Sequence, residues 1–357
     1  GVSFSRDGGH LVSGSQDDTA KIWRLTSLNT VQRTAHRNGV FDVAINAAGD
    51  RMATVSDDRQ VKIWDLQGNL KSLVNSHRAP IYGISFSPNG DRIATASGDQ
   101  TVKLWNRRGD LQQSLELGQG VYGVAFSPSG ELLAAGGAGG AVKLWSQNGE
   151  LLADLDGHGE LVNDVAFSPM APIIGTASWD KTAKLWDLEG NELVTLKGHT
   201  SEVVAIAFSP IGEVVATASS DKTVKLWDLQ GKELETFKGH GSAITDVNFS
   251  PDGDTLVTSD QEGAVKLWGI AGEELIHLSS HDQTVYGVQF TPNGNSLVTA
   301  SADGTVVIWE LDTLAGLMEQ ACSWMRNYLA HNLKITDNDR QLCKQISPQT
   351  LAPASGM

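Results

Sequence analysis

The feature that most constrains the fold is a tryptophan that recurs about every 41 residues. Seven of the eight recurring tryptophans close a Lys-Ile-Trp or Lys-Leu-Trp triplet. They fall at intervals of 41 residues, with one interval of 40, and are Trp23, Trp64, Trp105, Trp145, Trp186, Trp227, Trp268 and Trp309. A fixed period of this length is typical of repeat architectures, in which each repeat is one supersecondary unit. The sequence therefore predicts a stack of eight similar units.

Each unit is expected to contain four short strands, because apolar and polar residues alternate with period two between turn-forming clusters. In the unit that begins at His199 these strands, denoted a, b, c and d, are Val203–Phe208, Val214–Ser219, Val224–Trp227 and Glu233–Phe237. Turn formers such as Ser-Pro-x-Gly and Ser-Asp-Lys-Thr connect them. Such a sheet is apolar on both faces and cannot bury itself, so the units must stack around an axis. The fold class is therefore an all-β propeller.

The repeated motifs also resemble a known family. Gly-His, Ser-Pro-x-Gly, a strand with Ser or Thr, and Asp-x-Thr-Val-Lys-Leu-Trp recur over residues 1–311 and are similar to the WD40 family. This resemblance implies a propeller that binds other molecules on its faces. The segment QACSWMRNYLAHNLKITDNDRQLCKQI, residues 320–346, resembles a tail found after WD40 arrays in cyanobacterial proteins, including arrays attached to STAND-type signalling NTPases. That second resemblance implies a sensor role.

The number of blades depends on how the ring closes. The eighth unit has strands a, b and c but no strand d after Trp309. One closure is an eight-bladed ring whose last blade has three strands. The alternative is a seven-bladed ring of units two to eight, in which residues 30–35 cross over as the missing strand d and residues 1–27 are left out. We favour eight blades, because the seven-bladed ring would leave an apolar three-stranded unit in water.

The expected domain organisation is a propeller over residues 1–311, a two-helix tail packed on it over residues 312–346, and a flexible terminus over residues 347–357. Apolar residues recur at helical spacing after Leu314, and Thr336 with Asp339 suits the start of a second helix. Cys322 and Cys343 are expected to help bury the two helices together. The first residue is Gly1 rather than Met, so we expect the chain to be part of a longer protein.

Three polar positions recur with six of the eight tryptophans: His at minus 28, Ser or Thr at minus 10, and Asp or Glu at minus 6. The sets are His36, Thr54, Asp58 and Trp64; His77, Thr95, Asp99 and Trp105; His158, Thr176, Asp180 and Trp186; His199, Thr217, Asp221 and Trp227; His240, Thr258, Glu262 and Trp268; and His281, Thr299, Asp303 and Trp309. A hydrolytic triad is needed only once, so six copies indicate structure rather than catalysis. In the WD40 family such residues form a buried hydrogen-bonded chain that ends at the indole N–H. In the fourth unit Leu117, Ala135 and Gly139 replace all three polar members together.

A partner is expected on the face where the d–a and b–c loops meet, because antiparallel strands bring those loops to one end of every blade. Position minus 23, near the start of strand a, holds Phe41, Tyr82, Tyr122 and Tyr286, and a b–c turn holds Trp179. We predict that these five form an aromatic arc around the channel mouth, since aromatic residues often anchor ligands. Asp57, Glu202, Ser220 and Gln261 would supply polar contacts. The alternative is that the aromatic residues belong to the core.

Composition excludes several other classes. The net charge of −15 argues against nucleic acid, which binds chiefly through Lys and Arg. No apolar run is long enough to span a bilayer, so no membrane partner is expected. Neither Cys322 nor Cys343 has metal-site spacing, and no cofactor or metal is expected. We predict a cytoplasmic, monomeric, non-catalytic scaffold for a protein or peptide, with the STAND-type sensor as the alternative and an enzyme as a distant one.

Overall fold

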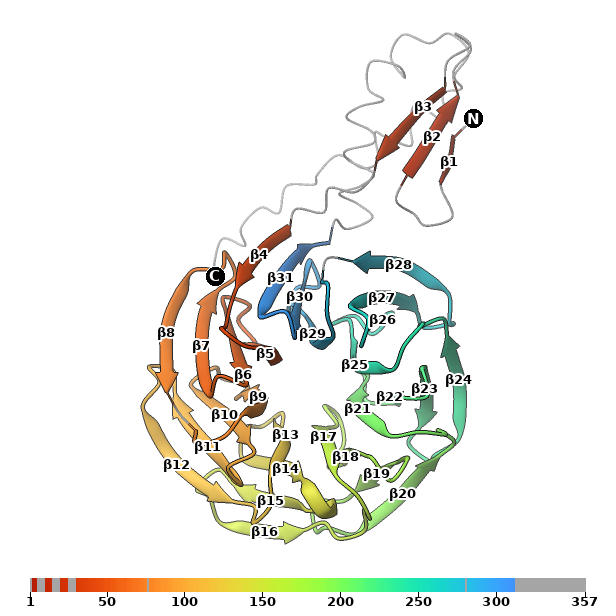
Figure 1. The fold of residues 1–357 in the computed structure, drawn as a ribbon. Helices are drawn as coiled ribbons and strands as arrows, with labels where there is room; N and C mark the ends of the chain where they lie inside the picture. Colours follow the sequence, from red (N-terminus) through yellow and green to blue (C-terminus); the bar gives the residue numbers. More distant parts are fainter. Residues whose placement is uncertain are drawn as a thin grey trace, which may run out of the picture. The chain divides into compact units, whose positions relative to one another are not determined.

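The chain forms a ring of seven four-stranded antiparallel sheets in a computed structural model (Figure 1). The structure describes residues 30–311 except Ser76 and Ser280, together with three strands between residues 2 and 24. We number the sheets blade 1 to blade 7, which correspond to the second to eighth sequence repeats. In each blade strand a lies innermost and strand d outermost (Figure 1), and strands a of neighbouring blades contact one another.

The strands follow the period-two pattern of the sequence closely. Blades 1 to 4 consist of β5 (Val40–Ile45), β6 (Arg51–Ser56), β7 (Gln60–Asp65) and β8 (Leu70–Asn75); β9 (Ile81–Phe86), β10 (Arg92–Ser97), β11 (Thr101–Asn106) and β12 (Leu111–Glu116); β13 (Val121–Phe126), β14 (Leu132–Gly137), β15 (Val142–Ser146) and β16 (Leu151–Asp154); and β17 (Val162–Phe167), β18 (Ile174–Ser178), β19 (Thr182–Trp186) and β20 (Glu192–Lys197). Blades 5 to 7 consist of β21 (Val203–Phe208), β22 (Val214–Ser219), β23 (Thr223–Asp228) and β24 (Glu233–Lys238); β25 (Ile244–Phe249), β26 (Thr255–Asp260), β27 (Ala264–Gly269) and β28 (Glu274–Ser279); and β29 (Val285–Phe290), β30 (Ser296–Ser301), β31 (Thr305–Glu310) and β4 (Thr30–Thr34).

The ring closes with seven blades, so the favoured eight-bladed prediction is wrong. Strand β4 pairs with β31 as the outer strand of blade 7, with Thr34 opposite Thr305 and Thr30 opposite Trp309. Strands β1 (Val2–Phe4), β2 (His10–Gly14) and β3 (Ala20–Arg24) form a separate three-stranded sheet. The prediction of eight blades considered the exposure of the first unit but not the gain from a fourth strand in the last blade. Pairing with β4 gives blade 7 the same four strands as the other six blades and packs Val31 against the core between blades 7 and 1.

The core lies between the blades rather than in one central mass. Between blades 5 and 6, for example, Val224 and Leu226 of β23 pack with Val247 of β25 and Trp268 of β27. Each recurring tryptophan of the seven blades is at most 6% exposed, which places its indole well inside such a layer. Because the two faces of every sheet are covered by neighbouring blades, strand b is buried on both sides. The outer strand d, by contrast, is largely exposed.

The helical tail does not appear in the described part of the chain. The one helical segment there is the 3₁₀ helix η1 (Ala138–Gly140), which replaces the b–c turn of blade 3. The two helices expected over residues 312–346, with Cys322 and Cys343 between them, lie outside the described residues, as does the terminus at 347–357. The fold class that the structure supports is therefore an all-β, seven-bladed propeller.

Candidate functional site

A hydrogen-bonded chain runs from strand c to the b–c turn through the recurring His and Thr. In blade 5, Trp227 Nε1 donates to Thr217 Oγ1 at 2.8 Å, and this oxygen lies 2.8 Å from His199 Nε2. His199 Nδ1 lies 2.9 Å from Asp221 Oδ2. The same chain joins His36, Thr54, Asp58 and Trp64; His77, Thr95, Asp99 and Trp105; His158, Thr176, Asp180 and Trp186; and His281, Thr299, Asp303 and Trp309.

The environment of these sets suits structure and not nucleophilic catalysis. Thr217 is 0% exposed, so no substrate reaches its hydroxyl, and its oxygen already accepts the indole N–H. Burial lowers the pKa of His77 to about 4, which outweighs the raising effect of Asp99. The imidazole is therefore neutral at pH 7. Burial opposes ionisation of Asp99, but hydrogen bonds from Thr101 and the backbone of Arg78 outweigh it and lower the carboxyl pKa to about 2.

Blade 6 uses a different acid from the one that its sequence position predicts. Asp260 Oδ2, not a Glu262 oxygen, lies 2.8 Å from His240 Nδ1, while His240 Nε2 is 2.7 Å from Thr258 Oγ1. Asp260 ends strand b, where the other complete sets have Ser, and its side chain is 2% exposed. The Glu262 backbone N–H donates to Asp260 Oδ1 at 3.0 Å. A carboxylate at the end of β26 is thus already within reach of His240, and Glu262 is left in the turn.

Blade 3 replaces the polar chain by apolar packing. Leu117 and Ala135 are 3% and 0% exposed and belong to the same buried cluster as Trp145. Gly139 lies in the 3₁₀ helix with φ of 67°, a left-handed conformation that suits glycine. This blade is therefore held by packing where the other six use hydrogen bonds.

Four aromatic rings form a continuous arc at the mouth of the central channel. The ring centroids of Phe41 and Tyr286 lie 5.2 Å apart, and those of Phe41 and Tyr82 also lie 5.2 Å apart. Tyr82 and Tyr122 stack at 4.6 Å with nearly parallel planes. We call Tyr286, Phe41, Tyr82 and Tyr122 the aromatic arc. Each residue is second in its strand a, so blades 7, 1, 2 and 3 contribute one ring each.

The opposite half of the mouth is polar or small at the same position. There Asn163 Nδ2 donates to the Val204 carbonyl at 2.7 Å, and Thr245 Oγ1 donates to the Val285 carbonyl. The mouth therefore has an aromatic half and a half whose side chains bond to the next blade. Such asymmetry would orient a ligand that reached both halves.

The remaining predicted contact residues lie in the loops of this face, apart from the arc. Trp179 is 46% exposed in the b–c turn of blade 4 and makes no ring contact with the arc among the described residues. Asp57 accepts a hydrogen bond from Asn38 at 2.9 Å. Burial raises the pKa of Tyr82, and the nearby Tyr122 and Asp57 raise it further. The Ser220 backbone N–H donates to the Glu202 carbonyl at 2.9 Å, and that of Gln261 to Ala243 at 3.0 Å. The predicted set is thus brought to one face but not into one cluster.

Three carboxyl groups line the channel just inside the aromatic arc. Asp42, Asp164 and Asp246 come from strands a of blades 1, 4 and 6 and line a cavity of about 150 Å³ together with the arc. Each accepts its own next backbone N–H and one from the following blade; Asp42, for example, accepts from Val43 at 2.7 Å and Ile84 at 2.9 Å. They therefore tie neighbouring inner strands together across the blade interface.

Desolvation raises the pKa of these half-buried carboxyls, although the backbone donors lower it. Burial is the largest influence in all three; it raises the pKa of Asp42 to about 7 and that of Asp164 to about 6, and it raises the pKa of Asp246 well above the ordinary value. Sequence reasoning did not single out these residues. The available signal was position minus 22, which holds Asp in three repeats and Gly or Ala in the other four repeats of the ring.

Among the described residues, no three His, Cys, Asp or Glu side chains gather so that they could hold a metal ion. Over the same residues, no helix is long and apolar enough to cross a membrane. The channel mouth thus combines aromatic rings, polar loops and three carboxyl groups.

Comparison with known proteins identifies two similar families. Residues 1–269 match the family described as IFT122 first beta-propeller, and residues 272–310 match the family described as WD domain, G-beta repeat. A search among curated proteins finds no match. The predicted resemblance of residues 320–346 to the tails of STAND-type arrays is not shown by these matches, because the segment lies beyond both matched ranges.

Proposed function

Because the chain belongs to the WD40 β-propeller family, we propose that it is a non-catalytic scaffold that binds a protein or peptide on the face formed by its d–a and b–c loops. The observation that supports this most is the aromatic arc. Interface energy concentrates in a few aromatic and Arg anchors. Four contiguous rings at the rim of a cavity give a partner side chain a surface to pack against.

The exposure of the aromatic arc supports a role in binding over a role in the core. Tyr286 is 37% exposed, and the other three rings are partly buried. The core positions of strand a are filled instead by the preceding and following apolar residues, such as Val121 and Val124, which are 0% and 7% exposed. The alternative interpretation, in which the arc is core packing, does not account for rings left open to the channel. Asp57, Glu202, Ser220 and Gln261, with Trp179, would contribute contacts around it.

The proposal is tested with peptides selected from a randomised displayed library against the full chain. Tyr82→Ala and Tyr286→Ala should each weaken the binding of the selected peptides at least about tenfold, since an anchor contributes about 2 kcal/mol or more to the binding free energy. Ile211→Ala is the matched control, because Ile211 is a large apolar residue, 61% exposed, in an a–b turn of the opposite face. Peptides that bind both tyrosine variants as tightly as the unaltered chain would refute the proposed face. Thermal unfolding of each variant shows whether its fold is intact.

A narrower role, as the sensor end of a STAND-type NTPase, rests on the resemblance of residues 320–346. In that role a ligand bound on the same face would release an upstream switch. The gene sequence upstream of Gly1 tests it: a P-loop motif GxxxxGK[ST] there would support the sensor, and further propeller repeats without one would count against it.

A further inference from the structure

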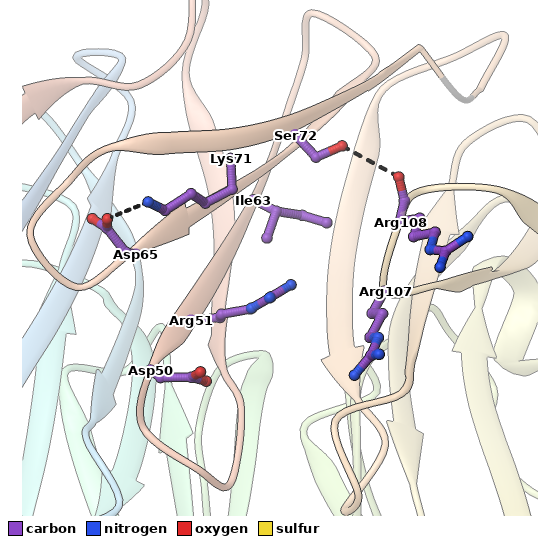
Figure 2. A pocket seen from close by; sticks show the side chains of 8 residues that line it. All are labelled: Asp50, Arg51, Ile63, Asp65, Lys71, Ser72, Arg107 and Arg108. Carbon is purple, nitrogen blue, oxygen red and sulfur yellow. Dashed lines mark hydrogen bonds and ion pairs between the residues drawn. The ribbon is translucent and has the colours of Figure 1, made fainter.

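A cationic pocket lies between blades 1 and 2, on the side where the a–b and c–d turns meet (Figure 2). It encloses about 520 Å³ and is lined by four cationic and two acidic side chains, in a chain whose net charge is −15. Arg51 and Lys71 come from blade 1, and Arg107 and Arg108 come from the c–d turn of blade 2. The pocket is therefore positively charged although the whole molecule is negatively charged, and it lies on the face opposite the proposed docking face.

The guanidinium of Arg51 differs from its counterpart on the next blade. Arg92 occupies the same position of blade 2, and its Nη1 donates to the Gln147 carbonyl in the c–d turn of blade 3 at 2.9 Å. Within the described ranges, the guanidinium of Arg51 has no hydrogen bond or ion pair, although its backbone is held by Asn46 at 3.0 Å. Figure 2 shows the Arg51 side chain pointing across the pocket toward the turn that contains Arg107. Its donors are therefore available to a ligand.

The acidic residues of the pocket are engaged by other groups. Asp65 forms an ion pair with Lys71 at 2.8 Å and accepts the backbone and side-chain N–H groups of Asn69 at 2.8 and 2.9 Å. The hydrogen bonds from Lys71 and Asn69 lower the pKa of the Asp65 carboxyl, so it stays ionised and its charge is balanced by Lys71. Asp50 accepts from Asn46 Nδ2 at 2.7 Å. Neither acid forms an ion pair with Arg51 in the part of the chain that the structure describes.

The c–d turn of blade 2 is also distinctive. Its first residue is Asn106, where blades 1, 4 and 5 have Asp, and its acidic residue is Asp110 at the other end of the turn; two adjacent arginines lie between them. The Asn106 side-chain oxygen accepts the backbone N–H groups of Arg108 and Asp110 at 2.8 and 3.0 Å, which fixes the turn. Arg107 has one distant ion pair, 3.9 Å from Asp91, with both side chains more than 60% exposed. A pair that exposed contributes little and is easily exchanged for another anion.

We propose that this pocket binds a phosphate monoester. Planar guanidinium groups such as that of Arg51 suit the oxygens of a dianion, because each can donate two parallel hydrogen bonds. The shared chemistry fits a phosphorylated side chain of a peptide and a small phosphorylated molecule. A polyanion is disfavoured by the net charge of −15, and a nucleobase would find no aromatic ring in the lining.

The experiment titrates the full chain with a phosphoserine peptide free of Lys and Arg, followed by ³¹P NMR. The expected result is millimolar or tighter binding and a lowered second pKa of the phosphate, since nearby cations favour the dianion. Arg51→Gln and the double variant Arg107→Gln/Arg108→Gln should each weaken binding at least about tenfold. Arg92→Gln is the control for Arg51, because its guanidinium is already bonded. Lys232→Gln/Lys238→Gln removes the same charge as the double variant from exposed positions on blade 5.

The controls should stay within about twofold of the unaltered chain, since they leave the pocket intact. Equal loss in the Lys232→Gln/Lys238→Gln variant would overturn the proposal, because the affinity would then come from overall charge. The absence of ³¹P shifts at ten-millimolar peptide, about ten times the weakest affinity expected, would also overturn it. Titration with inorganic phosphate, and competition of the unphosphorylated peptide against the phosphopeptide, identify the source. Phosphate that binds as well as the phosphopeptide points to a small ligand, and tighter binding of the phosphopeptide points to a modified protein.

Discussion

Replacing Thr217 by Val tests whether the repeated polar chains stabilise the blades. Valine keeps the shape of threonine but removes the hydroxyl, so the cavity term is small. The substitution leaves two buried groups without a partner: Trp227 Nε1–H, which donates at 2.8 Å, and His199 Nε2, at 2.8 Å. An unsatisfied buried polar group costs about 1–3 kcal/mol. We therefore expect the free energy of unfolding to fall by about 2–4 kcal/mol.

The assay is urea denaturation followed by tryptophan fluorescence and by circular dichroism, with coincident curves as the requirement for a two-state analysis. Ala135→Thr is the matched control, since it introduces a hydroxyl at the same register of blade 3. There Leu117 replaces the histidine, so we expect no gain in stability. A loss below about 0.5 kcal/mol for Thr217→Val would refute the reasoning, because it is within the range of ordinary surface substitutions.

Three further outcomes are expected. Val31→Asp in β4 should lower the melting temperature by several degrees, because Val31 packs against the core between blades 7 and 1. Leu70→Asp in β8 should change the melting temperature little, because Leu70 is 50% exposed, and equal effects of the two variants would contradict the closure. Burial lowers the pKa of His77 from 6.5 to about 4, so the unfolded chain binds a proton at a higher pH than the folded chain does, and the free energy of unfolding should fall by up to about 3 kcal/mol as the pH falls from 6.5 to 4. Denaturation curves of His77→Gln should show a weaker dependence of this free energy on pH, and an unchanged dependence would contradict the burial of His77. Burial raises the pKa of Asp42 to about 7, so the folded chain keeps a proton that the unfolded chain releases, and the contribution of this group to stability falls as pH rises from 4 to 7. Carboxyl ¹³C NMR should show the titration midpoint of Asp42 near neutrality, and a midpoint near 4 would contradict the burial.

Local structure was predictable because it follows from local chemistry. Strand β21 covers Val203–Phe208 and β22 covers Val214–Ser219, the same ranges that period two predicts. Alternating side chains and turn formers act within a few residues, so one unit suffices to place its strands. The position of Phe41, Tyr82, Tyr122 and Tyr286 in one register also follows from the repeat.

Closure could not be read in the same way, because it depends on pairing between residues 30–34 and 305–309. Residues 30–34 form an outer strand that is mostly exposed, so their apolar pattern is weak and does not identify a partner. The acid of blade 6 was misassigned for a related reason. A register count points to Glu262, whereas the shape of the turn brings the neighbouring strand end at Asp260 to His240.

The three channel carboxyls were missed because each is unremarkable within its own strand. Asp42 in one strand a suggests only an exposed polar position, since alternate residues of a strand usually face water. Only the ring places Asp42, Asp164 and Asp246 in one channel and supplies a donor from the next blade, such as Ile84 N–H at 2.9 Å. Their burial is a property of the assembled propeller rather than of any single repeat.

The most direct test of the account is a nuclear Overhauser effect between the rings of Phe41 and Tyr286 in a sample protonated only at aromatic residues. Seven-bladed closure places their centroids 5.2 Å apart, whereas an eight-bladed ring would insert the first repeat between them. The Phe41–Tyr82 pair is the internal control, since its centroids are also 5.2 Å apart and lie on adjacent blades in either ring. Seven-bladed closure predicts both cross-peaks. A Phe41–Tyr82 cross-peak without a Phe41–Tyr286 cross-peak would contradict the seven-bladed ring and the continuous aromatic arc that depends on it.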